Sequence, residues 1–117
     1  MDECIFCKIV AGEIPARVVW EDERVVAFDD IAPQAPVHTL VIPRQHHVDL
    51  ADGMSPEALG ALFAAVPEVA AAKGVADSGY RVIVNNGRDA GQLVGHVHVH
   101  ILGGRAMAPG MVRFEDE

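Results

Sequence analysis

Residues 96–101 read His-Val-His-Val-His-Ile, so three histidines alternate with three β-branched apolar residues. Strict alternation is the period of a β-strand with one buried face, and the pattern predicts a strand from residue 95 to residue 102. On such a strand all three imidazoles project from one face, with neighbouring rings about 6.7 Å apart. A row of imidazoles is a poor way to build a hydrophobic core, and it indicates a site that handles charge.

Three interpretations of His96, His98 and His100 stay open on this pattern alone. The imidazoles could face solvent on an edge strand. They could ligate a metal, because His-x-His pairs can share one zinc ion. They could also form a catalytic site in which one imidazole attacks a substrate and its neighbours fix its tautomer and charge.

The order of the other patterned segments predicts an α+β protein with a mostly antiparallel sheet of five strands. The strands are expected at residues 18–21, 24–29, 37–42, 79–85 and 95–102, where β-branched residues gather between turn signals. A short helix is expected to begin near Cys4 and to end at Gly12, and one long helix is expected from Pro56 to Lys73 with a kink or break at Pro67. The whole chain, residues 1–117, is expected to form one domain.

The acidic composition limits the partners that the chain can have. The sequence has 17 acidic against 9 basic residues and a formal net charge of −8, and it contains no basic run. Binding to the phosphate backbone of a nucleic acid needs a basic footprint, so no nucleic-acid polymer is expected as a partner. A small anionic ligand stays possible, because a few backbone N–H groups and imidazoles can bind one locally.

The apolar segments of the chain are short. None of them reaches 18 uninterrupted apolar residues, so no membrane span is expected. The acidic first residues do not resemble a signal peptide. The chain is therefore expected in the cytoplasm, where Cys4 and Cys7 would stay reduced rather than form a structural disulfide.

The alternating stretch also matches a family motif. Residues 96–102, His-Val-His-Val-His-Ile-Leu, fit the pattern His-φ-His-φ-His-φ-φ, in which φ is apolar. The chain closely resembles the histidine triad (HIT) family, and within it the Hint branch of purine nucleoside phosphoramidase-like proteins, from about residue 5 to about residue 111. Further stretches that carry the likeness are residues 5–16, 32–43, 79–87 and 103–107. The resemblance implies a HIT-like fold with one long and one short helix.

The resemblance implies roles for four histidines. His98 would be the nucleophile, which attacks the α-phosphorus of a nucleoside monophosphate derivative and forms a nucleotidyl-imidazole that water hydrolyses. An imidazole suits this step because it is nucleophilic when neutral near pH 7. His100 would contact the phosphate, and His96 would support the site or ligate a metal. His38 would lie behind these three, unless it is simply a hydrogen-bonded core histidine.

A nucleotide-binding set is also implied: Phe6, Ile9, Phe28, Asp30, Ile31, Asn85, Gly91, Gln92, Leu93, Val94, His98 and His100. The loop that includes Asn85, Gly91 and Gln92 would lie beside the phosphate, Asp30 would bind the ribose hydroxyls, and apolar side chains would wall the base. Plainer interpretations stay open, because Asn-Gly sequences form turns, Asp side chains cap loops and apolar residues are usually core.

Two features depart from the family pattern. Leu93 stands where the family often has Ser or Thr, whose hydroxyl helps to orient the phosphate and the leaving group. The Trp-Pro-Pro-Gly ending of the family is shortened here to Ala-Pro-Gly at residues 108–110. Both changes are expected to affect turnover or the specificity for the leaving group.

The pair Cys4-x-x-Cys7 has only three residues before it, whereas a thioredoxin-like redox motif needs a preceding strand. Zinc needs about four nitrogen or sulfur ligands. The resemblance to bacterial HIT proteins implies a structural zinc held by Cys4, Cys7, His46 (or its neighbour His47) and His96. The alternative is a pair of reduced thiols.

The resemblance therefore predicts a homodimeric hydrolase that cleaves the P–N bond of purine nucleoside phosphoramidates, which are AMP or GMP derivatives. The long helix and the 79–85 strand are expected at the dimer interface. Other functions stay open: a hydrolase of dinucleoside polyphosphates, a non-catalytic purine-nucleotide-binding signalling protein, or a zinc module that uses the three histidines as ligands.

Overall fold

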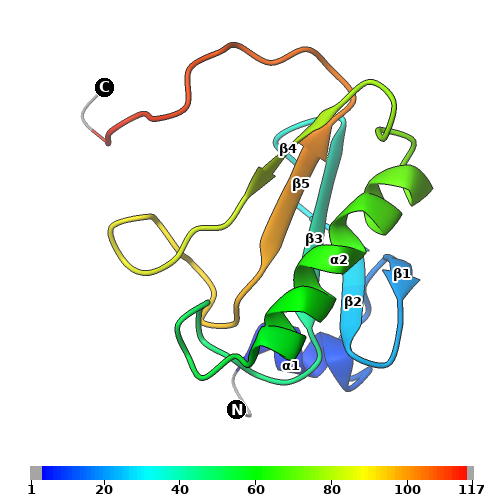
Figure 1. The fold of residues 1–117 in the computed structure, drawn as a ribbon, viewed down its shortest axis with the longest axis vertical. Helices are drawn as coiled ribbons and strands as arrows, with labels where there is room; N and C mark the ends of the chain where they lie inside the picture. The colour runs from blue at the N-terminus through cyan, green and yellow to red at the C-terminus, as the bar shows by residue number, and fades with distance from the viewer. Residues whose placement is uncertain (1–3, 116–117) are drawn as a thin grey trace.

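The computed structural model describes residues 4–115, which form two helices and five strands. In chain order the elements are α1 (Ile5–Val10), β1 (Val18–Glu21), β2 (Val25–Asp29), β3 (Val37–Pro43), α2 (Pro56–Ala72), β4 (Tyr80–Ile83) and β5 (Val99–Gly103). The strands lie in the order β1-β2-β3-β5-β4, and every neighbouring pair is antiparallel (Figure 1). The predicted α+β fold, with a five-stranded antiparallel sheet and one long and one short helix, is confirmed. The acidic residues near the two ends of the sequence, Asp2, Glu3, Asp116 and Glu117, lie outside the described residues.

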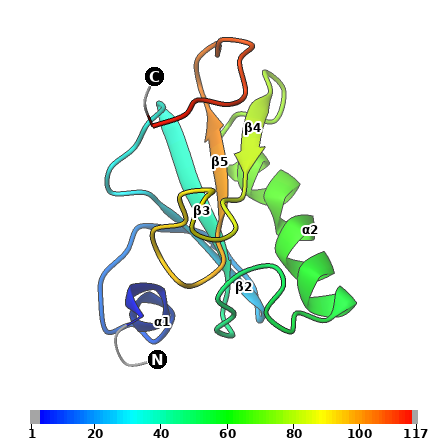
Figure 2. The same cartoon turned by 90° about the vertical axis from the view of Figure 1, so that its left-hand side faces the viewer.

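The sheet separates two hydrophobic cores, because α1 and α2 cover opposite faces of it (Figure 2). Alternate residues of a strand point to opposite faces, and the apolar runs of β2 and β3 therefore supply both cores. The α2 side contains Val25, Ala27, Val41, Leu62, Ala65, Val66, Val69, Val97, Val99 and Ile101. The α1 side contains Phe6, Val26, Phe28, Leu40 and Ile42. The even-numbered residues of β3 and β5, which include His38 and His100, thus face α1.

Helix α2 begins at the predicted residue. The hydroxyl of Ser55 accepts the backbone N–H of Ala58 at 3.0 Å, which caps the helix, and Pro56 takes a position where no N–H is needed. Of the predicted kink or break at Pro67, the break is wrong, because the helix is continuous from Pro56 to Ala72. Pro67 lies on the exposed side of α2, so the carbonyl of Phe63 that loses its partner can bond to water. Within the part of the chain that the structure describes, no helix is long and apolar enough to cross a membrane.

Strand β5 is shorter than predicted, since it begins at Val99 rather than near residue 95. The register pairs Val41 with Val99, and its continuation would place Val97 opposite Pro43, which has no N–H to donate. The backbone N–H of Val97 instead donates to the carbonyl of His47 at 2.8 Å. His96 and His98 therefore precede the regular strand, and only His100 lies within it. Strand β4 is likewise shorter than the predicted 79–85 segment.

Candidate active site and metal centre

Three histidines gather on the face of the sheet that α1 covers. His100 lies in β5 opposite Leu40 of β3, and His38 lies two residues before Leu40, opposite Leu102. His98 directly precedes β5. The ring centroids of His98 and His100 are 4.9 Å apart, and those of His38 and His100 are 5.2 Å apart. His38 thus contacts the triad rather than lying apart from it in the core.

Hydrogen bonding holds the His98 imidazole in one tautomer. Its Nδ1 lies 2.8 Å from the backbone oxygen of His96. A carbonyl oxygen only accepts, so Nδ1 carries the proton and Nε2 keeps its lone pair when the ring is neutral. The residue is 7% exposed, and its ring meets that of Phe6 in an edge contact at 5.1 Å. An imidazole with a free Nε2 in a fixed orientation can act as a nucleophile.

A second chain of hydrogen bonds orients His38 and His100. The backbone N–H of Gln34 donates to Nδ1 of His38 at 3.1 Å, so the proton of a neutral His38 ring lies on Nε2. That Nε2 donates to Nδ1 of His100 at 2.9 Å, which leaves the proton of His100 on Nε2. This Nε2 is buried and has no hydrogen-bond partner among residues 4–115. Sequence reasoning misses Gln34, because a backbone donor leaves no signature in the sequence.

The buried, unpaired donor of His100 suits an anionic oxygen. A buried N–H without an acceptor is costly, and an incoming oxyanion would satisfy it. The ring centroids of His98 and His100 are 4.9 Å apart, so an oxyanion bonded to His100 would lie close to the imidazole of His98. The pair has the arrangement of a nucleophile with an electrostatic stabiliser.

The charge of His100 provides a test of this arrangement. Burial, with smaller contributions from His98 and His38, lowers the pKa of His100 from 6.5 to about 4. The folded protein therefore keeps His100 neutral at pH values where the unfolded chain has already bound a proton. Stability is complete above about pH 6.5 and falls as the pH drops toward 4, by about 1–2 kcal/mol between pH 7 and pH 5. Urea unfolding at the two pH values measures this change. In His100→Asn the free energy of unfolding should fall by about 1–2 kcal/mol less than in the wild type between pH 7 and pH 5. An identical dependence in both proteins would contradict the lowered pKa.

Asp30 borders a cleft beside His38. Its Oδ1 accepts the backbone N–H of Ala32 at 2.8 Å, which confirms the Asx-turn interpretation, while its Oδ2 lies 3.5 Å from Nε2 of His38. The cleft, called the Asp30 cleft below, has a volume of about 460 Å³. Its lining residues are Arg17, Asp29, Asp30, Ile31, Pro33, Pro36, His38 and Lys73. The structure therefore brings Asp30 and Ile31 together at one opening next to the histidines.

The loop between β4 and His96 is braced by Gln92. Its Oε1 accepts the backbone N–H of Gly87 at 2.8 Å, and its Nε2 donates to the carbonyls of Val48 and Val94 at 2.6 and 2.9 Å. Both ends of the amide are engaged inside the loop, so these contacts do not support a side-chain contact from Gln92 to a phosphate. Gly91 adopts φ 82°, which favours glycine and lets the loop turn back.

The other predicted loop residues differ in their surroundings. Asn85 is half-buried just after β4. Asn86 anchors the turn, because its Oδ1 accepts the backbone N–H of Leu50 at 2.8 Å. Leu93 is 94% exposed, so its side chain lies in solvent.

Of the predicted base wall, Phe6 and Phe28 are buried together, with ring centroids 5.5 Å apart. Phe6 also meets the rings of His96 and His98 in edge contacts, so it holds the two histidines against α1. Ile9 packs at the margin of this cluster, whereas Ile31 is 97% exposed beside the Asp30 cleft. Phe6 and Phe28 are therefore core residues in this structure, as the plainer interpretation expects.

A second group of side chains meets at the start of α1. The ligand atoms of Cys4, Cys7, His46 and His96 all lie within 4.8 Å of one another. Nδ1 of His96 is 3.5 Å from Sγ of Cys4 and 3.6 Å from Sγ of Cys7, and Nδ1 of His46 is 3.2 Å from Sγ of Cys7. In a tetrahedral zinc site, sulfur and nitrogen ligands lie about 3.6 Å apart, given the usual metal–ligand distances. The four residues therefore fit a zinc ion in both chemistry and spacing.

His96 presents the correct nitrogen to this group. Its Nε2 donates to the carbonyl of Pro43 at 2.8 Å, so Nδ1 keeps its lone pair toward the two sulfurs. Burial lowers the pKa of His96 to about 4, which keeps the ring neutral, as a metal ligand must be. His46 rather than His47 joins the group, because Nδ1 of His47 bonds to the carbonyl of Asp52 at 2.8 Å.

The interpretation of the triad as three ligands of one metal does not agree with the geometry. His96 turns toward the cysteines, and His100 belongs to a separate group with Asp30 and His38. His98 is in neither of the two groups of potential metal ligands found among residues 4–115. The three histidines are thus divided between two sites.

The structure is that of an α+β protein whose three alternating histidines belong to two neighbouring sites. Comparison with known proteins identifies its family. The model of the HIT domain matches residues 11–107, so the chain belongs to the HIT family. A solved HIT family hydrolase from Clostridium thermocellum superposes with a TM-score of 0.90 at 42% identity, and the match covers 96% of this chain and 99% of that one.

Two curated relatives are similar over nearly the whole chain. Protein HitA of Neisseria gonorrhoeae is 49% identical over 106 residues, which cover 88% of this chain and 97% of the relative. The purine nucleoside phosphoramidase of Escherichia coli K12 is 43% identical over 110 residues, which cover 92% of each chain. The predicted membership of the HIT family is confirmed.

Proposed function

We propose that this protein is a nucleotide hydrolase that cleaves the P–N bond of purine nucleoside phosphoramidates. The observation that carries the proposal is the pairing of two nitrogens: an Nε2 on His98 and a buried N–H on His100, neither of which has a hydrogen-bond partner among residues 4–115. The name of the Escherichia coli relative supports the same reaction. His98 would attack the phosphorus, His100 would stabilise charge on a phosphate oxygen, and His38 would orient His100.

The proposed reaction has two steps. Nε2 of His98 attacks the α-phosphorus, an N–P bond forms to the enzyme, and the P–N bond to the leaving amine breaks as the amine takes up a proton. Water then attacks the nucleotidyl-histidine and releases the nucleoside monophosphate. In both steps the N–H of His100 would stabilise charge on a non-bridging oxygen. Asp30 would bind the ribose, since its cleft opens beside the histidines.

A structural zinc ion is proposed at Cys4, Cys7, His46 and His96. Zinc would tie the start of α1 to the segment that carries the histidines. Burial raises the pKa of the Cys7 thiol, and a bound cation would reverse that direction because a coordinating thiol loses its proton. The role is structural, because neither His98 nor His100 belongs to this group of ligands and the proposed chemistry needs no metal.

A homodimer is proposed through β4 and α2. Among the described strands, β4 pairs only with β5, so its other edge is open, and Val82 on β4 and Phe63 on α2 are 42% and 39% exposed. Light scattering at micromolar concentration measures the mass in solution. A monomer under these conditions would exclude the proposal.

The activity is tested by comparing three ligands. Adenosine 5′-phosphoramidates with an amine leaving group should be hydrolysed much faster than a dinucleoside polyphosphate. Faster cleavage of the polyphosphate would favour the alternative hydrolase. Tight binding of AMP with no turnover of either substrate would favour a nucleotide-binding signalling protein.

Leu93 provides a test of the departure from the family pattern. Leu93→Ser is expected to raise the turnover of an adenosine phosphoramidate about three- to tenfold, because the resemblance to the family assigns a hydroxyl at this position to orienting the phosphate and the leaving group. The melting temperature should stay nearly constant, since the side chain is 94% exposed. Leu93→Ala is the matched control that removes the side chain without adding a hydroxyl. An equal rise in both variants would show that bulk, rather than the hydroxyl, matters.

A further inference from the structure

Cys4 and Cys7 are the two cysteines of the chain, and they lie together at the start of α1. Cys4 is the N-cap residue of the helix, and its Sγ accepts the backbone N–H of Cys7 at 3.4 Å. The two sulfurs lie within 4.8 Å of each other. Cα atoms three residues apart in a helical turn are about 5 Å apart, which is inside the range that a disulfide spans. Rotation of the side chains would therefore let the two sulfurs bond.

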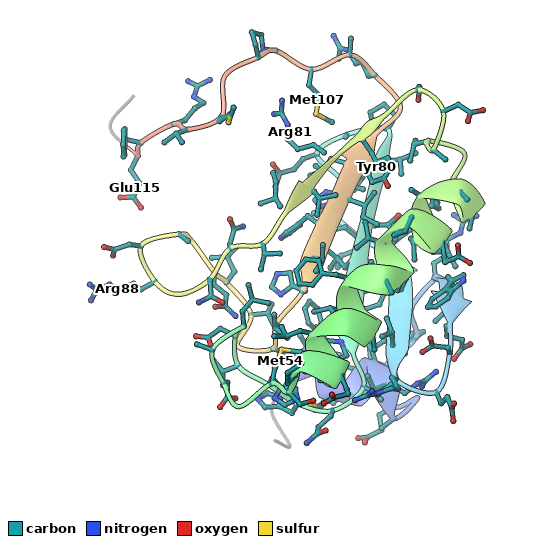
Figure 3. The ribbon with its side chains drawn as sticks, viewed as in Figure 1. Met54, Tyr80, Arg81, Arg88, Met107 and Glu115 are labelled. Atoms are coloured by element: carbon teal, nitrogen blue, oxygen red, sulfur yellow. The ribbon has the colours of Figure 1, made fainter. Side chains whose placement is uncertain are left out.

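Both sulfurs are accessible to a small oxidant. Cys4 and Cys7 are each half-buried rather than enclosed in the core. Figure 3 shows α1 at the lower end of the molecule, whereas Met107 and Glu115 of the C-terminal segment lie far above it. The described part of the C-terminal segment therefore does not cover the two cysteines.

A disulfide would join different parts of the chain from those that the proposed zinc ion would join. Through zinc, Cys4 would be connected to His96, which is 92 positions away. Cys7 would be connected to His46, which is 39 positions away. A disulfide between the cysteines spans only three positions. Because the entropy that a cross-link removes from the unfolded chain grows with the size of the closed loop, this disulfide would add little stability.

The start of α1 also contacts the proposed nucleophile. Phe6, which lies between the two cysteines in the sequence, is buried, and its ring meets that of His98 in an edge contact at 5.1 Å. The carbonyl of His96, a proposed zinc ligand, accepts the N–H of the His98 ring at 2.8 Å. Loss of the metal would loosen both contacts that hold the imidazole of His98.

We propose that Cys4 and Cys7 are a site of reversible oxidation, at which a hydroperoxide converts the two zinc-bound thiolates to a disulfide and the zinc is released. The inference rests on the structural zinc ion proposed above and goes beyond it, because it gives the two cysteines a second state. Oxidation replaces a cross-link between distant segments with a local one, and the protein becomes less stable and less active until it is reduced.

The reaction balances with hydrogen peroxide as the oxidant. One thiolate attacks a peroxide oxygen, the O–O bond breaks, the sulfur becomes a sulfenic acid, and the departing hydroxide takes up a proton to form water. The second thiolate attacks that sulfur, an S–S bond forms, the S–O bond breaks, and the second hydroxide takes up a proton. The two thiolates give up two electrons in total. The two histidines that remain are fewer than the four ligands that a structural zinc ion needs.

Treatment of the zinc-loaded protein with hydrogen peroxide tests the proposal. The treatment should release one zinc ion per chain, which a chromophoric chelator measures, and the mass of the metal-free chain should fall by about 2 Da as two thiol hydrogens are lost. The melting temperature should fall by about 10 °C or more, to the value that a chelator alone produces. Dithiothreitol followed by zinc should restore the zinc content, the mass and the melting temperature.

Cys4→Asp is the matched control. An aspartate can cap α1 and ligate zinc, but it cannot form a disulfide. Peroxide should therefore add oxygen to Cys7 of this variant instead of lowering its mass, and reduction should recover less zinc binding than in the wild type, because sulfinic acid is not reduced by thiols. Should Cys4→Asp bind zinc too weakly for this comparison, the change in mass of the wild-type chain decides the question alone.

Three results would overturn the inference: zinc that stays bound in the presence of excess peroxide, zinc that leaves while both thiols still react with iodoacetamide, or a wild-type chain that gains oxygen without losing 2 Da. A protein that cannot be loaded with zinc removes the zinc site and the inference together. None of these results bears on the phosphoramidase function, which is tested by the cleavage of adenosine phosphoramidates.

Discussion

Replacing His98 with alanine is expected to lower kcat for an adenosine phosphoramidate by at least about a thousandfold. The variant loses the imidazole whose neighbour, His100, has an N–H donor without a partner among the described residues. Affinity for AMP should change only a few-fold, since the ribose and phosphate contacts do not depend on the nucleophile. Steady-state kinetics and AMP titration measure the two effects separately.

Detection of a covalent intermediate tests the role of His98 as the nucleophile more directly. Rapid quenching of the wild-type protein with substrate, followed by mass spectrometry, should locate a nucleotidyl group on the peptide that carries His98. Arg24 is an exposed residue of the β1–β2 turn, and Arg24→Gln, as a control for handling, should match the wild type in rate and labelling. Turnover of His98→Ala within tenfold of the wild type, or a label on another residue, would overturn the assigned role.

Loss of the proposed zinc should have the second large effect. Cys7→Ser is expected to remove the metal and to lower the free energy of unfolding by at least about 3 kcal/mol, which corresponds to a fall of about 10 °C or more in Tm. The reason is that Cys4, Cys7, His46 and His96 join segments up to 92 positions apart in the sequence. Elemental analysis should give one zinc per chain, and calorimetry with and without a chelator measures the stability.

Two neighbouring histidines supply a matched control for the zinc site. His46→Gln should lose the metal, whereas His47→Gln should keep it, because the ring of His47 bonds to the carbonyl of Asp52 instead. Equal zinc contents in these two variants would contradict the ligand set. Since the carbonyl of His96 holds Nδ1 of His98, metal loss should also lower kcat more than it changes KM.

Much of the fold follows from local patterns in the sequence. The apolar runs of β2 and β3 and the serine cap at Ser55 depend on neighbouring residues, so they can be predicted without knowledge of the tertiary structure. The start of β5 and the continuity of α2 at Pro67 differ from prediction. The start of β5 depends on Pro43, which lies opposite on the facing strand and has no N–H to donate. The continuity of α2 depends on solvent, which can bond to the carbonyl that Pro67 leaves without a partner.

The sequence by itself determined which reactive side chains the chain carries and how they are spaced: His96, His98 and His100 in alternation, and the pair Cys4 and Cys7. The tertiary structure alone decided which atoms of these side chains are free. It turned Nδ1 of His96 toward the cysteines, and it left Nε2 of His98 and the N–H of His100 without a partner in the part of the chain that the structure describes. Such choices depend on hydrogen-bond partners that only strand register and loop packing bring within about 3 Å, so local sequence patterns do not encode them.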